Sequence, residues 1–277
     1  RLYLSLDESC GKRSLFSSAD GIGWKRHCGF PKGHNGDIVV LPNGIYSVMG
    51  NSIFFSRDGD NWRKIIDSPN LPSTAVRYGD MMVGYKSDVP GLWESRDGIL
   101  WRNRGEERVK LSLIPYDMKE KTENDDLNYS IVEFNNALWI IGNSPDHIYC
   151  SKNGTTWSKV APDPVARFLP RLKAAVSAFK GYLWIMGGVW CGNTPEMNEK
   201  KYIVLNDIWR SRDGRKWENC TTDAPWCRRS EAKLAVFKNA LYMYGGGGYG
   251  YQPYEIWKSE NGTDWKMILS SDSPEYS

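Results

Sequence analysis

The sequence contains one short motif six times, and this repeat constrains the fold more than any other feature. Each copy reads aliphatic, aromatic, any residue, Ser, any residue, Asp or Asn, Gly, two further residues and Trp. Asp-Gly or Asn-Gly between two apolar runs predicts a tight β-hairpin turn, because Gly adopts positive φ without strain. The Ser and Asp side chains can bond the backbone N–H groups of such a turn. The acidic or amide position is Asp20, Asp58, Asp97, Asn153, Asp213 and Asn261.

A second repeat, of two short apolar segments, precedes most of these hairpins. The segments are 37–40 with 45–50, 131–134 with 138–142, 176–179 with 183–188, and 234–237 with 241–246. A tight polar turn joins the two segments each time, so a full unit has four antiparallel strands, A to D. The shortest units are about 40 residues long, which is typical of a β-propeller blade.

We therefore expect an all-β chain with a single domain, residues 1–277, folded as a six-bladed β-propeller of four-stranded antiparallel blades. The first blade is expected to be incomplete, because residues 1–4 already match strand B. Either the chain is part of a longer protein or assembly, or residues 270–277 complete this blade. The blades are expected to end near Trp24, Trp62, Trp101, Trp157, Trp217 and Trp265.

The Ser-x-Asp-Gly-x-x-Trp hairpin resembles the Asp-box repeat of sialidase-like propellers. Residues 183–188, which read Leu-Trp-Ile-Met-Gly-Gly, and Ala-Pro-Trp at 224–226 resemble kelch repeats. Together the two resemblances cover nearly the whole chain and imply a β-propeller. They imply no single function, because such propellers include enzymes, lectin-like binders and scaffolds. In all six copies Gly directly follows the acidic residue, whereas the usual Asp-box has one residue between them, and this difference favours a function other than that of a sialidase.

Loop lengths differ between the two faces of the predicted propeller. The A–B and C–D turns share one face and are short, whereas the B–C and D–A connections share the other face and vary in length. The long connections are 103–127, 189–202 and 247–254. Insertions on one face of a rigid scaffold commonly carry binding or catalysis. We expect any ligand to bind at this B–C/D–A face.

Charged residues form the first candidate set on that face. Arg77, Asp126, Arg171 and Arg229, together with His34, are expected near the starts of A strands. Because strand A is innermost in a propeller, their side chains would surround the mouth of the central channel. Two interpretations remain open. The arginines converge on an anionic or hydroxyl-rich ligand, or they pair with carboxylates across blades and close the channel.

Aromatic residues of the long connections form the second candidate set. Trp190, Tyr249, Tyr251 and Tyr254 are suited to stacking on sugar rings or to anchoring a protein contact. Tyr251 or Tyr254 with Glu255 would also provide the Tyr–carboxylate pair that a sialidase-like mechanism needs. A nucleophile, a base and an orienting group cannot be identified together, so we predict binding rather than catalysis and assign no catalytic residue.

Composition limits the partners and cofactors. The chain has 36 basic and 33 acidic residues, a net charge of +3, which argues against dedicated nucleic-acid binding. No run approaches the roughly 20 apolar residues of a membrane span, so we expect no membrane insertion. The three His residues are far apart and the Gly run at 245–248 is not followed by Lys-Ser or Lys-Thr, so we expect neither a metal nor another cofactor.

Cysteine positions bear on the compartment. Six Cys residues permit up to three disulfides. We expect Cys10 to pair with Cys28, and Cys227 to pair with Cys191 or Cys220, because each group falls on one predicted face. Four Asn-x-Ser/Thr sequons occur, at positions 128, 153, 219 and 261. Two of these sequons are explained by the repeat turn itself and carry little weight. We expect an extracellular or cell-envelope location.

Three functions from different classes fit these observations. The leading hypothesis is a non-catalytic binding propeller that recognises a glycan or a partner protein through the B–C/D–A face. The alternative is a glycan-active, sialidase-like hydrolase or lyase that uses the same arginines with Tyr254. The third is a structural propeller within a larger surface or virion assembly.

Overall fold

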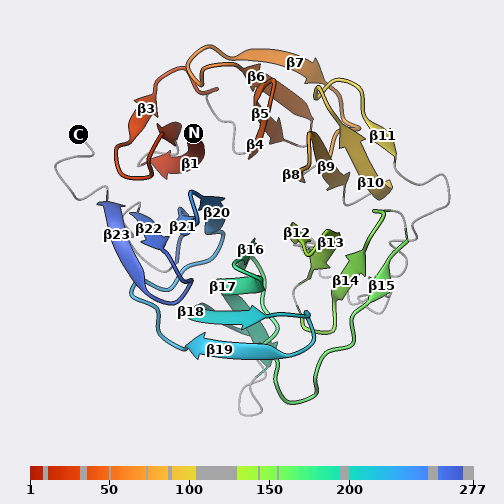
Figure 1. Ribbon diagram of the computed structural model, residues 1–277, viewed down its shortest axis with the longest axis vertical. Coiled ribbons are helices and arrows are strands. Elements are labelled where there is room, and N and C mark those ends of the chain that lie inside the picture. Colours follow the sequence, from red (N-terminus) through yellow and green to blue (C-terminus); the bar gives the residue numbers. More distant parts are fainter. Residues whose placement is uncertain are drawn as a thin grey trace. The chain divides into compact units, whose positions relative to one another are not determined.

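The computed structural model describes residues 1–8, 12–31, 36–49, 51–72, 74–86, 89–103, 130–142, 144–154, 156–193, 200–248 and 255–270. The elements over these residues are β-strands in six antiparallel sheets, one of three strands and five of four (Figure 1). Within each sheet the strands follow one another in sequence order. The predicted fold class, a six-bladed β-propeller with an incomplete first blade, is confirmed. The chain divides into two compact units, residues 1–127 with 151–157 (unit 1) and residues 128–150 with 158–277 (unit 2).

Unit 1 contains the first three blades. Blade 1 consists of β1 (Leu2–Glu8), β2 (Lys12–Ser18) and β3 (Lys25–His27). Blade 2 consists of β4 (Asp37–Leu41), β5 (Gly44–Met49), β6 (Ser52–Ser56) and β7 (Arg63–Asp67). Blade 3 consists of β8 (Thr74–Tyr78), β9 (Met81–Lys86), β10 (Val89–Ser95) and β11 (Arg102–Asn103). The first strands of neighbouring blades contact each other, β1 with β4 and β4 with β8.

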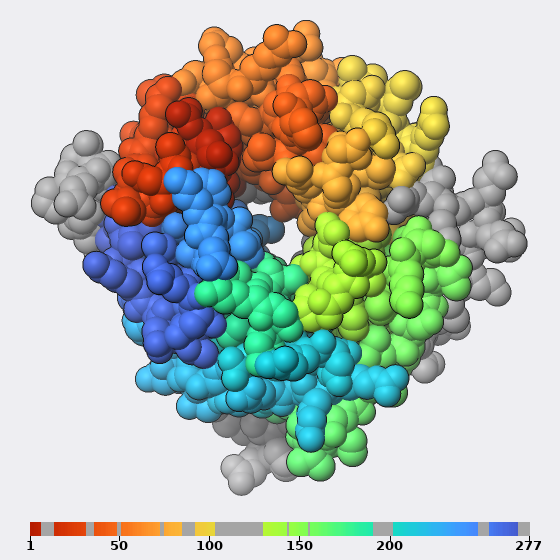
Figure 2. Space-filling model, viewed as in Figure 1, coloured from red at the N-terminus to blue at the C-terminus, as the bar shows by residue number. Residues whose placement is uncertain are grey.

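Unit 2 contains the last three blades. Blade 4 consists of β12 (Ser130–Phe134), β13 (Ala137–Ile141), β14 (Ile148–Ser151) and β15 (Ser158–Lys159). Blade 5 consists of β16 (Ala175–Phe179), β17 (Tyr182–Asn193), β18 (Lys200–Ser211) and β19 (Trp217–Thr221). Blade 6 consists of β20 (Lys233–Phe237), β21 (Ala240–Tyr244), β22 (Glu255–Ser259) and β23 (Trp265–Ser270). The A strands of these blades pack side by side, β12 against β16 and β16 against β20 (Figure 2).

The hydrophobic core lies between neighbouring blades. In unit 2 one buried cluster joins blades 5 and 6 and includes Trp184, Trp226 and Trp257. The Trp226 ring packs edge-on against Trp265, the last Trp of the repeat, with 5.0 Å between the ring centroids. Large aromatic rings bury much area and fill wide spaces between sheets. The high Trp content of the chain therefore has a structural reason.

The repeated turn makes the same type of hydrogen bonds from blade to blade. In blade 5 the Ser211 hydroxyl oxygen accepts the Gly214 N–H at 2.9 Å. Asp213 Oδ1 accepts the next two backbone N–H groups at 2.9 and 3.0 Å. Gly214 has φ of 71°, which is strained for any other residue. The Trp217 indole N–H donates to the Gly214 carbonyl at 3.0 Å and closes the hairpin.

The turn glycine also sets the approach of one blade to the next. A Cβ atom at Gly214 would lie 2.5 Å from the Trp139 ring of blade 4, and one at Gly262 would lie 2.4 Å from the Trp184 ring of blade 5. Both rings are held by a hydrogen bond from the indole N–H to a strand A carbonyl of their own blade. Because neither ring can move freely, the repeat requires glycine for packing as well as for φ.

The short A–B turns of unit 2 place both central residues at positive φ. The φ angles are 50° at Asn135 and 56° at Asn136 in blade 4, and 46° at Lys238 and 59° at Asn239 in blade 6. Such a pair is typical of a type I′ turn, whose twist matches that of the flanking antiparallel strands. These turns fix the register of the A–B hairpins that carry the core residues.

Candidate binding site

Arg171 is buried and forms an ion pair within blade 5. Its side chain is 1% exposed, and its two terminal nitrogens bind the Asp207 carboxylate of β18 at 2.5 and 2.9 Å. The remaining donors reach backbone carbonyls of Leu169 and Gly187, both at 3.0 Å. Asp207 also accepts the Trp209 indole N–H at 2.7 Å. The guanidinium group is therefore neutralised within its own blade.

Arg229 repeats this arrangement in blade 6. Its side chain is 1% exposed, and Nη2 binds Glu255 Oε2 at 2.5 Å. Its other donors reach the carbonyls of Cys227 at 3.1 Å and Gly245 at 3.2 Å. Glu255 accepts the Trp257 indole N–H at 2.8 Å. Each arginine thus pairs with a carboxylate that stands two residues before the Trp of the same blade, and not with one across blades.

Of the remaining charged candidates, only Arg77 lies within the described residues. Arg77 is the fourth residue of β8, next to the A–B turn, and its Nε donates to the Gly79 carbonyl at 2.7 Å. We expected it near the start of strand A, but the structure places it near the other end, because β8 starts only at Thr74. Asp126 and His34 lie outside the described residues.

Of the four aromatic candidates, one lies within the described residues. Tyr249, Tyr251 and Tyr254 lie outside the described residues, whereas Trp190 is half-buried in β17. The sequence predicted residues 189–202 to be a loop. The structure corrects this, because β17 and β18 continue as paired strands to Asn193 and from Lys200. We call the part of this hairpin formed by residues 188–193 and 200–205 the arm.

The base of the arm is fixed by two neighbouring segments. Leu172 and Val189 exchange both backbone hydrogen bonds at 2.8 Å. On the other side, the Arg229 N–H donates to the Leu205 carbonyl at 3.2 Å and its carbonyl accepts the Gly188 N–H at 3.0 Å. These bonds hold the backbone of the arm where it leaves blade 5.

Two aromatic side chains lie on opposite faces of the arm. Trp190 is directly opposite Ile203, and the next cross-strand pair is Cys191 with Tyr202. Because side chains alternate along a strand, Trp190 and Tyr202 point to opposite faces. Tyr202 is 52% exposed. The arm therefore presents aromatic area on a rigid backbone.

Sequence reasoning missed a Ser–His–Asp set in unit 1. His27 Nε2 lies 2.8 Å from the Ser17 hydroxyl oxygen, and His27 Nδ1 lies 3.0 Å from Asp60 Oδ1. The Lys25 ammonium group and His27 lower the pKa of Asp60 below its usual range. Ser17 is 3% exposed and His27 is 1% exposed, and the imidazole packs against Gly59 of the next blade. A substrate has no access to this hydroxyl, so we assign the set to the packing of blade 1 on blade 2.

The cysteines within the described residues form no disulfide. They are Cys28, Cys150, Cys220 and Cys227. The predicted pairing of Cys10 with Cys28 and that of Cys227 with Cys191 or Cys220 are therefore not present. Cys220 is half-buried beside the Arg210–Glu218 ion pair, and burial raises the pKa of its thiol. Cys227 is instead exposed, so the two thiols have different surroundings.

The described residues contain no group of three or more His, Cys, Asp or Glu side chains arranged to hold a metal ion. They also contain no helix that is long and apolar enough to cross a membrane.

Comparisons with known proteins give the fold. No family model and no curated protein matches the sequence. Among solved structures, the chain is similar to the one described as "Structure of YjhT", with a TM-score of 0.63 and 13% sequence identity. The similarity covers 92% of this chain and 90% of that chain. At this identity it shows a shared β-propeller fold and nothing about activity.

Proposed function

We propose that the protein is a non-catalytic binding propeller that recognises a glycan or a partner protein through its B–C/D–A face, with the arm of blade 5 as the main contact. The observation that carries this proposal is the arm itself. It extends the B–C hairpin of one blade and holds Trp190 and the exposed Tyr202 on a fixed backbone. Rigid aromatic side chains lose little conformational entropy on binding, which favours affinity.

The paired state of the buried arginines supports binding over a sialidase-like reaction. Arg171 and Arg229 would have to leave their carboxylates before they could hold an acidic substrate. Removing one partner from a buried ion pair costs about 3–5 kcal/mol. A site that begins with this cost is a poor one for an anionic transition state, whereas a contact through the uncharged Trp190 and Tyr202 side chains leaves the ion pairs of Arg171 and Arg229 in place.

The test compares Trp190→Ala and Tyr202→Ala with Ile22→Ala. Ile22 is 73% exposed on the C–D turn of blade 1, so its replacement controls for loss of surface apolar area. The wild-type protein is applied to a glycan array and, in parallel, to candidate partner proteins by surface plasmon resonance. We expect a specific signal that both arm variants weaken and Ile22→Ala retains. A fluorogenic sialoside is assayed beside these measurements.

Two results would refute the proposal. Turnover of the sialoside by the wild-type protein would favour a sialidase-like hydrolase or lyase. Absence of binding in all assays would favour a purely structural propeller.

A further inference from the structure

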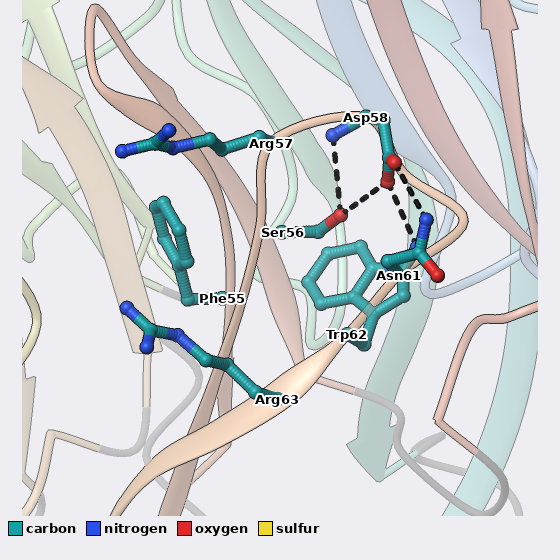
Figure 3. A pocket seen from close by; sticks show the side chains of 7 residues that line it. All are labelled: Phe55, Ser56, Arg57, Asp58, Asn61, Trp62 and Arg63. Carbon is teal, nitrogen blue, oxygen red and sulfur yellow. Dashed lines mark hydrogen bonds between the residues drawn. The ribbon is translucent and has the colours of Figure 1, made fainter.

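An open cavity of about 420 Å³ lies on the C–D hairpin of blade 2, within unit 1. Its volume falls within the range of small-molecule sites. Figure 3 shows its lining, with the Phe55 ring between the Arg57 and Arg63 side chains and the Trp62 indole beside the turn. The lining residues are Phe55, Ser56, Arg57, Asp58, Asn61, Trp62 and Arg63.

Both guanidinium groups of this cavity lack an ion-pair partner among the described residues, and both side chains are exposed. Arg63 lies over the Phe55 ring, with its guanidinium carbon 5.5 Å from the centroid. The nearby Asp58 carboxylate is directed into the turn, where it accepts two backbone N–H groups at 2.8 and 2.9 Å and the Asn61 amide at 2.7 Å. These bonds, the Asn61 backbone N–H first, hold the pKa of Asp58 well below its usual range.

Two equivalent positions in other blades form ion pairs. Arg96 of blade 3 occupies the position of Arg57 and binds Asp80 at 2.5 Å. The position of Arg63 is Glu218 in blade 5, where it binds Arg210 on the opposite strand at 2.8 Å. In blade 2 the residue opposite Arg63 is Phe55, which cannot neutralise it. Among the C–D hairpins of blades 2, 3 and 5, the one in blade 2 therefore carries two arginines without an ion-pair partner in the described residues, beside the half-buried Phe55 ring.

We propose that this cavity binds a phosphate or sulfate ester carried on a flat ring. Two guanidinium groups provide planar sets of N–H donors that match tetrahedral oxyanions. Phe55 and Trp62 provide apolar walls for the ring that carries the anion. The cavity belongs to unit 1 and the arm to unit 2, and this proposal does not depend on the proposed function.

Isothermal titration at low ionic strength tests this directly, with phenyl phosphate and phenyl sulfate as probes and phenol as the neutral control. We expect one of the two anions to bind, phenol to fail, and added salt to weaken the complex because it screens charge. Arg57→Gln and Arg63→Gln should each lower the affinity about tenfold or more, since each removes charged hydrogen bonds. Arg96→Gln is the matched control and should leave the affinity unchanged, as should Trp190→Ala.

Any of three results would overturn the proposal. The first is that the wild-type protein binds neither anion, and the second is that it binds phenol equally well. The third is that the Arg57→Gln and Arg96→Gln variants bind the anion with the same affinity. Because Arg57, Arg63 and Arg96 are exposed, these variants should fold normally. Circular dichroism verifies this before the titration.

Discussion

Replacing the turn glycine of blade 6 by alanine should destabilise the protein through two separate effects. Gly262 has φ of 88°, and an L-residue in this region costs about 1–2 kcal/mol. The new Cβ would also lie 2.4 Å from the Trp184 ring. That ring is fully buried and its indole N–H is bonded to the Phe179 carbonyl at 2.9 Å. Overpacking of such a site adds about 1–3 kcal/mol.

Gly181 offers a control with the same backbone strain and no clash. It has φ of 74°, and a Cβ atom placed at this position would have no other atom within 4 Å. Gly181→Ala should therefore cost about 1–2 kcal/mol, and Gly262→Ala about 2–5 kcal/mol. At about 2–4 °C per kcal/mol, the melting temperatures should differ by several degrees. Urea unfolding followed by Trp fluorescence gives the free energies, and equal losses in the two variants would refute the packing role of the turn glycine.

Two further predictions concern charged groups. Hydrogen bonds to the turn, the backbone N–H of Ile22 first, lower the pKa of Asp20 from 3.8 to about 2. The ionised carboxylate therefore stabilises the folded state fully at pH values above 3.8. This stabilisation is lost as the pH falls toward 2. Changing the four turn aspartates to Asn should flatten the fall in melting temperature below pH 4, and an unchanged pH profile would contradict this role of the turns. Asp207→Asn should cost about 3–5 kcal/mol in urea unfolding because it leaves Arg171 buried without a counter-charge. Glu218→Gln, at an exposed ion pair, should cost about 0–1 kcal/mol, and similar losses in both would refute the distinction.

The fold could be predicted because its determinants are local. Asp213 and Gly214 make their turn with neighbours in the sequence, so the motif alone specifies the hairpin. Six copies then determine the number of blades. The first blade was correctly expected to be incomplete, since Leu2 already begins a strand that pairs with β2.

The candidate site was harder to predict because its contacts are distant in the sequence. Arg171 and Asp207 are 36 residues apart, and no local pattern joins them. A weaker signal was present, however, because an acidic residue stands two positions before Trp in blades 5 and 6, at Asp207 and Glu255. The arm was missed for another reason. Gly187 and Gly188 suggest the end of a strand, yet the chain passes through a bulge there and continues as a strand.

That bulge connects the buried arginine to the proposed binding surface. Gly187 and Gly188 have φ of 59° and 96°, and a Cβ at Gly188 would lie 2.7 Å from the Leu172 carbonyl oxygen. Arg171 donates to the Gly187 carbonyl, so the residue that neutralises Asp207 also holds the backbone at the start of the arm. Loss of this bond would loosen the backbone beside the arm, although the bonds from Leu172 and Arg229 remain, and would raise the entropy cost of binding. A folded Asp207→Asn protein should therefore bind more weakly, although Asp207 itself is not part of the arm.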